Sequence, residues 1–119
     1  MSDSDMQRNA VDVLQGSLDV IVLKTLSWQP MHGFGIARWI QRVTDDVLQV
    51  EEGSLYPSLY RMENKGWVKA EWRTTENNRQ AKYYRLTAAG KRQLAQSAST
   101  WEAFAEAMAK IMAAAPQRA

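Results

Sequence analysis

Cysteine is absent from this 119-residue sequence, which excludes disulfide bonds and thiolate metal sites. No apolar run approaches the roughly 18 residues that a membrane span needs. The N-terminus, MSDSDMQRNAVDV, is acidic and lacks the apolar core of a secretion signal. We therefore expect a cytoplasmic protein without a membrane partner, and the length favours one domain with a modest core.

Signatures of catalysis are equally scarce. The single histidine, His32, stands beside a turn glycine, with no carboxylate or nucleophile at a motif spacing. Glu51 and Glu52 are adjacent, so their side chains diverge and do not form an acid–base pair. The sequence contains no glycine-rich phosphate loop and no zinc signature. We expect no enzymatic activity, no metal and no cofactor.

Positive charge is concentrated in one part of the chain. The net charge is only +2, but residues 51–92 contain nine Lys or Arg against five Glu. Residues 1–16 are acidic, and residues 17–50 and 93–119 are balanced. A solvated charged surface explains such a bias as readily as a nucleic-acid footprint does. The structure of the segments that carry the charge distinguishes between these two interpretations.

The pattern of elements predicts a mainly α (α+β) fold. Residues 1–13 are polar and are expected to form a mobile tail. A helix capped by Ser17 follows, with Leu18, Ile21, Val22, Thr25 and Leu26 on its inner face. After a turn at residues 31–33 we expect a helix over 34–44 with Phe34 facing inward, and a short strand over 47–50. Two strands, 67–73 and 81–86, with a polar connector between them, read as a hairpin.

The third helix raises a question, because Pro57 stands among apolar residues at helical spacing in VEEGSLYPSLYRMENKGWV. A helix interior does not accept proline, but the first turn does. If Ser54 caps the helix, Pro57 is its third residue and the helix spans 54–65. A turn of about 100° per residue then leaves a polar, basic and aromatic face suited to the major groove of DNA. The residues of this face are Ser54, Tyr56, Pro57, Tyr60, Arg61, Asn64 and Lys65.

The hairpin strengthens the nucleic-acid interpretation. Its connector and base, residues 74–82, form a polar and basic finger without apolar content at the tip. Such a finger typically contacts phosphates or the minor groove. We predict DNA contacts at Arg73, Asn77, Asn78, Arg79 and Lys82. Three helices followed by this finger predict a winged helix-turn-helix over residues 14–86.

The last helix is expected to run from the cap Thr87 to Met112, followed by a frayed tail, 113–119. Its apolar residues alternate in steps of four and three, as in a heptad seam. It carries more apolar surface than a terminal helix buries within so small a domain, which predicts a homodimer. The alternative is a helix that folds back on its own core. The predicted interface comprises Leu94, Ala98, Trp101, Phe104, Ala105, Met108, Ile111 and Met112.

The strings LQGSLDVIVLKTLSWQPMHGFGIARWI, VEEGSLYPSLYRMENKGWV and KYYRLTAAGKR resemble the PadR family of bacterial transcriptional regulators, in its compact subfamily with one C-terminal helix. The resemblance covers roughly residues 14–101. H-G-F from His32 replaces the family's more usual H-G-Y. The resemblance implies a homodimeric repressor that binds a roughly palindromic double-stranded DNA operator. It also implies that Trp101 is placed to stack on a small aromatic effector, although an aromatic residue at heptad spacing is more often simply packing.

A winged-helix module that binds protein and not DNA is the alternative function, since the fold serves both. Salt dependence separates the two, because counterion release weakens DNA binding steeply as salt rises.

Overall fold

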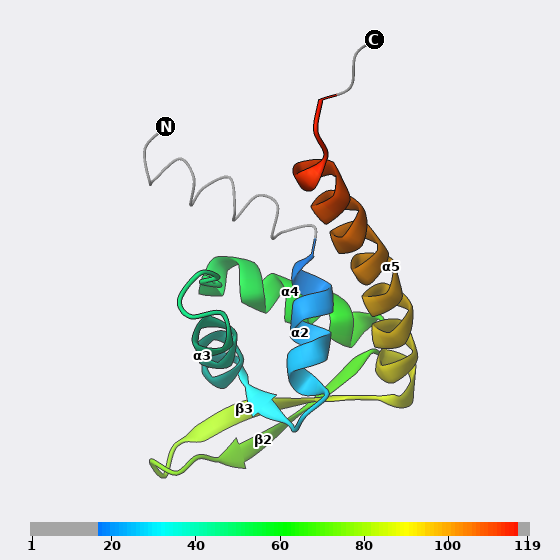
Figure 1. The fold of residues 1–119 in the computed structure, drawn as a ribbon. Coiled ribbons are helices and arrows are strands. Elements are labelled where there is room, and N and C mark those ends of the chain that lie inside the picture. Colours follow the sequence, from blue (N-terminus) through cyan, green and yellow to red (C-terminus); the bar gives the residue numbers. More distant parts are fainter. Residues whose placement is uncertain (1–16, 117–119) are drawn as a thin grey trace.

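The computed structural model describes residues 17–116 (Figure 1). Its elements are α2 (Leu18–Leu26), β1 (Met31–His32), α3 (Gly33–Val43), α4 (Glu52–Asn64), β2 (Val68–Thr74), β3 (Gln80–Leu86) and α5 (Ala88–Ala113). The fold is a winged helix-turn-helix of the α+β class, as the sequence predicts. The expected tail of residues 1–13 lies outside the described residues, as do residues 117–119 of the expected frayed end.

The sheet is antiparallel, with the strand order β1-β3-β2. β2 and β3 form the predicted hairpin, and β1 pairs with β3 through Met31 and Tyr84. The prediction of a turn at residues 31–33 is therefore wrong, because Met31 and His32 take their strand geometry from this pairing. The predicted strand over 47–50 is also wrong. These residues form no strand, and the amide of Leu48 donates instead to Oγ1 of Thr44 at 3.1 Å.

The core lies where the three helices meet the sheet. α2 contributes the fully buried Val22 and Leu23 to the core. The other core residues are apolar side chains from α3, α4 and the strands. Helical period explains most of these positions. Thr25 is buried as well, because its hydroxyl donates to the carbonyl of Ile21 at 2.8 Å. The core comprises Leu18, Val22, Leu23, Leu26, Met31, Ile36, Ile40, Leu55, Leu59, Met62, Val68, Tyr84 and Leu86.

Phe34 does not face the core, contrary to the prediction. α3 buries Gly33, Ile36 and Ile40. Phe34 is two residues before Ile36, about 200° of helical rotation, so it points to the opposite side of the helix. Its ring is 62% exposed, stacked on His32 and covered on one side by Arg38. His32 caps α3, because its Nδ1 accepts the amide proton of Gly35 at 2.9 Å. The first turn of α3 thus presents a phenyl ring at the surface.

α5 contacts the body along its first half, where Leu94 packs against the core. Thr87 caps it by accepting from the Gly90 amide at 3.0 Å, and the Thr87 hydroxyl donates to the carbonyl of Gly66 at 2.6 Å. Gly66 itself has a φ of 76°, which favours glycine, and ends the turn after α4. From Trp101 onward every described residue of α5 is exposed, and the helix stands clear of the other elements (Figure 1).

Candidate nucleic-acid interface

α4 begins three residues earlier than the predicted cap at Ser54 implies. Glu51, in extended conformation, is its N-cap, and the amide of Leu55 donates to the Glu51 carbonyl at 3.0 Å. Pro57 is consequently the sixth residue of the helix, and the late start at Ser54 is wrong. The proline leaves the carbonyl of Gly53 without an intrahelical donor. Gly53 is exposed, so water can replace that donor and the helix continues through the proline.

The outer face of α4 contains the predicted contact residues despite this shift. Leu55, Leu59 and Met62 are buried, and the opposite side faces solvent. Ser54 is half-buried in the first turn. Lys65 follows the helix as its C-cap, with its ammonium 4.6 Å from the ring centre of Trp67. The exposed predicted residues of the helix are Tyr56, Pro57, Tyr60, Arg61 and Asn64.

Asp19 of α2 connects directly to α4. Its Oδ1 accepts from the hydroxyl of Ser58 at 2.6 Å and from Nη2 of Arg61 at 2.9 Å. Ser58 is fully buried, whereas the Arg61–Asp19 pair is partly exposed to solvent. Arg61 is therefore engaged within the protein, a constraint that helical spacing alone does not reveal.

The tip of the hairpin is ordered by its own hydrogen bonds. The Thr75 amide donates to the carbonyl of Arg79 at 2.7 Å, and the Asn78 amide donates to the carbonyl of Thr75 at 2.9 Å. Asn78 has a φ of 59°, a conformation that asparagine tolerates better than most residues. Asn77 and Arg79 are exposed beside it. Within residues 17–116, Arg79 forms no ion pair.

The sheet register divides the basic residues of the hairpin between two faces. Trp72 pairs with Lys82, and Arg73 pairs with Ala81. Side chains that are opposite each other share a face, and sequence neighbours do not. Arg73 and Lys82, predicted together at the base of the wing, thus lie on opposite faces. Arg73 forms an ion pair with Glu71 and covers the ring of Tyr83.

Lys82 is on the face toward α4. Its ammonium lies 3.6 Å from Oε1 of Glu63 and 5.7 Å from the ring centre of Tyr84. Burial raises the pKa of the Tyr84 phenol, and the nearby Glu63 and Tyr56 raise it further. In the free protein, Lys82 thus forms an ion pair with Glu63 of α4.

A cleft of about 540 Å³ joins the helices to the hairpin. Tyr56 of α4 and the wing residues Arg79 and Lys82 line it together. Phe34 and Trp72 line it as well, and neither was predicted as a contact residue. The sequence did contain one indication for Trp72. It is four residues after the core residue Val68 in the same strand, so the two side chains lie on the same face of the sheet. The cleft brings residues from α3, α4 and the wing to one surface.

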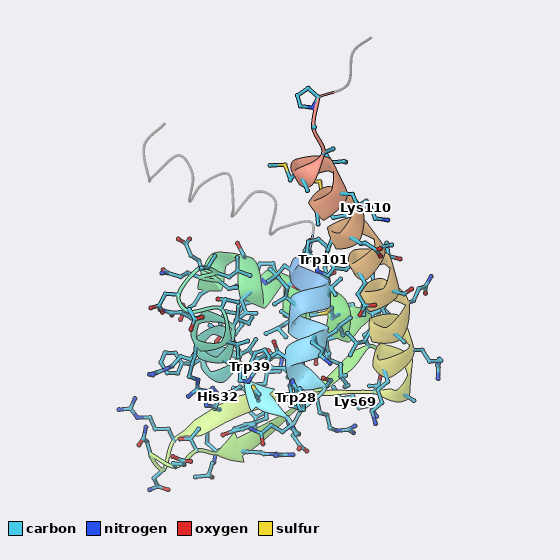
Figure 2. All side chains as sticks on the ribbon, viewed as in Figure 1. Trp28, His32, Trp39, Lys69, Trp101 and Lys110 are labelled. Atoms are coloured by element: carbon cyan, nitrogen blue, oxygen red, sulfur yellow. The ribbon has the colours of Figure 1, made fainter. Side chains whose placement is uncertain are left out.

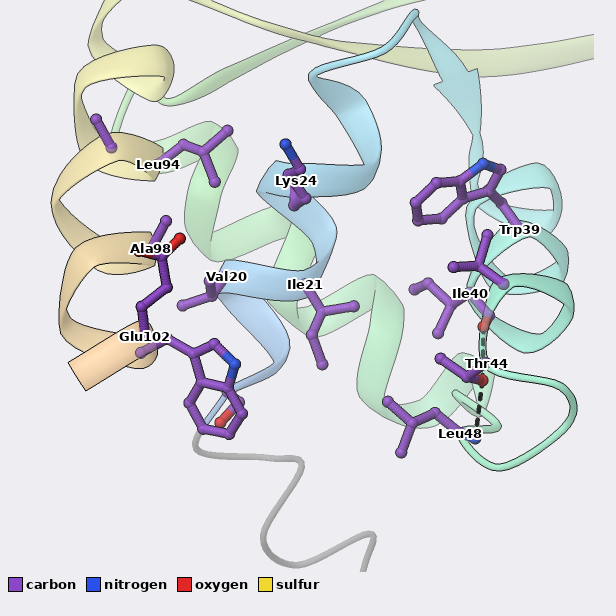
Figure 3. Close-up of a pocket in the computed structure, with 14 residues that line it drawn as sticks. Val20, Ile21, Lys24, Trp39, Ile40, Thr44, Leu48, Leu94, Ala98 and Glu102 are labelled. Carbon is purple, nitrogen blue, oxygen red and sulfur yellow. Dashed lines mark hydrogen bonds between the residues drawn. The ribbon is translucent and has the colours of Figure 1, made fainter. Parts of the chain in front are cut away.

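A second, apolar groove of about 550 Å³ lies between α2, α3 and α5 (Figure 3). Leu94 and Ala98 of the predicted dimer interface line it, and Trp101 does so at its end. Trp101 is 41% exposed and its ring lies 5.6 Å from that of Phe104. Figure 2 shows Trp101 where α5 leaves the body. The remaining predicted interface residues are exposed on α5: Phe104, Ala105, Met108, Ile111 and Met112.

The described part of the chain provides neither a metal-binding cluster nor a membrane-spanning helix. No group of three or more His, Asp or Glu side chains within residues 17–116 is arranged to hold a metal ion. None of the helices over that range combines the length and apolar character required to cross a membrane.

The helix-turn-helix, the exposed face of its last helix and the three-stranded wing define a winged-helix protein. The chain belongs to the PadR-like family of transcriptional regulators, whose family model matches residues 22–96, more than half of the chain. This family consists of non-enzymatic regulators that bind DNA.

Individual proteins are similar to this chain over most of its length. An uncharacterized protein of Lysinibacillus sphaericus is 30% identical over 90 residues, which cover 76% of this chain and 83% of the relative. A transcriptional regulator from Clostridium thermocellum is 29% identical, with a TM-score of 0.75 over 83% of this chain and 96% of its own. A PadR family regulator from Eggerthella lenta is 25% identical, with a TM-score of 0.75 over 95% and 96% of the two chains.

Proposed function

We propose that this protein is a sequence-specific DNA-binding repressor that acts as a cytoplasmic homodimer on a roughly palindromic operator. α4 enters the major groove, and the hairpin contacts the adjacent backbone. The observation that carries the proposal is the shared cleft, because Tyr56 of α4 and Arg79 of the wing line the same surface. Because residues of both elements face the same cleft, they can contact the same DNA duplex.

Homodimerisation is supported by the free half of α5. Trp101, Phe104 and Met108 present apolar surface that no other described element covers. A second copy of the same helix would bury it across a two-fold axis, and would place two α4 helices on two half-sites. A dimer bound to an operator that overlaps a promoter would exclude RNA polymerase and thereby repress transcription.

The test is a fluorescence anisotropy titration of the full chain against DNA from upstream of its own coding sequence. We expect tight binding that resists unrelated competitor DNA, with two protomers per site. The logarithm of the affinity should fall linearly with the logarithm of salt concentration, by about 0.9 for each phosphate neutralised. Binding that is absent, or insensitive to salt, would contradict the proposal and favour a protein-binding module.

Effector binding is a second candidate function, favoured by the apolar groove beside α5. Its volume of about 550 Å³ is within the range of small-molecule sites, and Trp101 and Trp39 both line it. A small planar aromatic molecule would stack on these indoles. Titration of such a dye should quench tryptophan fluorescence in the wild type and much less in Trp101→Ala. Equal quenching in both proteins would contradict the assignment.

A further inference from the structure

The cleft between the wing and the helices has an unusual lining. Trp72 and Phe34 are 68% and 62% exposed, yet both face this one cleft. Single exposed apolar residues need no explanation, but large rings gathered on a concave surface mark a binding site. The register assigns Trp72 to the helix side of the sheet because it pairs with Lys82, which also lines the cleft.

The charges of the lining point to an anionic ligand. Arg79 and Lys82 line the cleft, and none of the residues that line it is Asp or Glu, although Glu63 lies 3.6 Å from the ammonium of Lys82. Asn77 and Gln80 add neutral hydrogen-bonding groups near the tip. A lining that combines apolar rings with cations complements a chain that combines sugars with phosphates. A purely apolar partner would offer no acceptor to Arg79, which forms no ion pair within residues 17–116.

Two tyrosines of the lining, Tyr56 and Tyr84, lie against other parts of the fold. A Cβ atom on Gly33 would lie 2.5 Å from the Tyr56 hydroxyl oxygen, so only glycine allows the phenol to lie across the start of α3. Tyr84 of β3 is buried, and the ammonium of Lys82 lies 5.7 Å from the centre of its ring. The cleft is thus formed in the free protein, which lowers the entropic cost of binding.

We infer that this cleft holds the sugar–phosphate backbone of one DNA strand, with Trp72 and Phe34 packed against deoxyribose and Arg79 and Lys82 at the flanking phosphates. The inference rests on the proposed function and adds two apolar contact residues to it. Lys82 exchanges its ion pair with Glu63 for a phosphate when the strand binds.

The experiment compares full-length variants by anisotropy with the labelled upstream duplex and with a random-sequence duplex, each at several salt concentrations. Trp72→Ala and Phe34→Ala should each weaken binding about three- to tenfold, because partly buried apolar surface is lost. The salt slope should stay at the wild-type value, since neither side chain contacts phosphate. Trp72→Phe should retain most of the affinity.

Two variants serve as controls. Trp28→Ala removes an indole that is 66% exposed and lies outside the cleft, so its affinity should stay within twofold of the wild type. Arg79→Ala should reduce the salt slope by about one phosphate. Thermal unfolding of every variant confirms that the fold is retained, as expected for exposed side chains.

Each other outcome overturns the inference in a recognisable way. Wild-type affinity in Trp72→Ala and Phe34→Ala, with weaker binding in Arg79→Ala, would mean that DNA contacts the tip but not the cleft. A changed salt slope in Trp72→Ala would mean that the indole acts through Lys82 and not by contact. A wild type that binds neither duplex would remove the proposed function itself.

Discussion

The hydroxyl of Ser58 in α4 donates a 2.6 Å hydrogen bond to the carboxylate of Asp19 in α2. This contact joins residues 39 positions apart in the sequence, and Arg61 adds an ion pair to the same oxygen. Because Ser58 is fully buried, its hydroxyl has no access to water. Asp19 therefore sets the orientation of α4 relative to α2, and with it the orientation of the outer face of α4.

Asp19→Ala should lower the free energy of unfolding by about 1–3 kcal/mol, because it leaves the buried hydroxyl of Ser58 without an acceptor. Asp19→Asn keeps an acceptor oxygen and should lose less. Urea denaturation measures both. In the double variant Asp19→Ala/Ser58→Ala the orphaned hydroxyl is gone, so the second substitution should add little. Costs that simply add would show that the two side chains do not interact.

Glu63→Gln should strengthen DNA binding, because it releases Lys82 from its carboxylate partner. The pair is partly exposed, so its loss should change the free energy of unfolding by no more than about 1 kcal/mol. Glu71→Gln is the matched control, since it releases Arg73 on the opposite face of the hairpin. An equal gain in both variants would indicate a general charge effect.

Gly53→Ala and Gly90→Ala should have opposite effects on stability. No atom lies within 4 Å of a Cβ built on Gly53, so alanine should stabilise α4 by about 0.5–1 kcal/mol. A Cβ on Gly90 would overlap the carbonyl oxygen of Trp67, whose backbone cannot yield easily. We expect a loss of at least about 2 kcal/mol there. Thermal unfolding checks both, and a destabilised Gly53→Ala would contradict the geometry of α4.

Much of this fold follows from local sequence signals. The hairpin strands, the cap at Thr87, the glycine at position 66 and the length of α5 were predicted from spacing and turn chemistry, and the structure confirms them. These features depend on residues close together in the chain. Periodicity likewise identified most of the inward side of α2.

Several of the errors concern features that depend on partners distant in the sequence. Serine is a good helix cap, but α4 begins before Ser54, and it continues through Pro57 with its inner face packed in the core. β1 exists only because β3 pairs with it. The side of the wing that carries Lys82 depends on the hairpin register, in which a slip of one residue exchanges the faces. The position of Phe34 and Trp72 in the lining of one cleft could not be inferred without these placements.

Tyr84→Phe should flatten the loss of stability at alkaline pH. Burial, Glu63 and Tyr56 raise the pKa of the Tyr84 phenol above its usual 10.0, so the folded state retains its proton where the unfolded state has lost it. The stabilising effect is fully present below pH 10 and is lost as pH rises through the folded pKa. Urea denaturation at pH 8 and above pH 10 measures the difference. A variant with an unchanged pH dependence would show that Tyr84 does not carry this effect.

Trp101→Ala should shift the protein from dimer to monomer, because Trp101 begins the apolar stripe on the free half of α5. Aromatic residues at the centre of an interface commonly contribute at least 2 kcal/mol, so the dimer dissociation constant should rise about 30-fold or more. Sedimentation velocity across protein concentrations measures it. Since the indole is already 41% exposed in one protomer, the stability of that protomer should change far less. Trp28→Ala removes an exposed indole outside α5 and should leave the dimer intact. A fully dimeric Trp101→Ala would place the interface elsewhere.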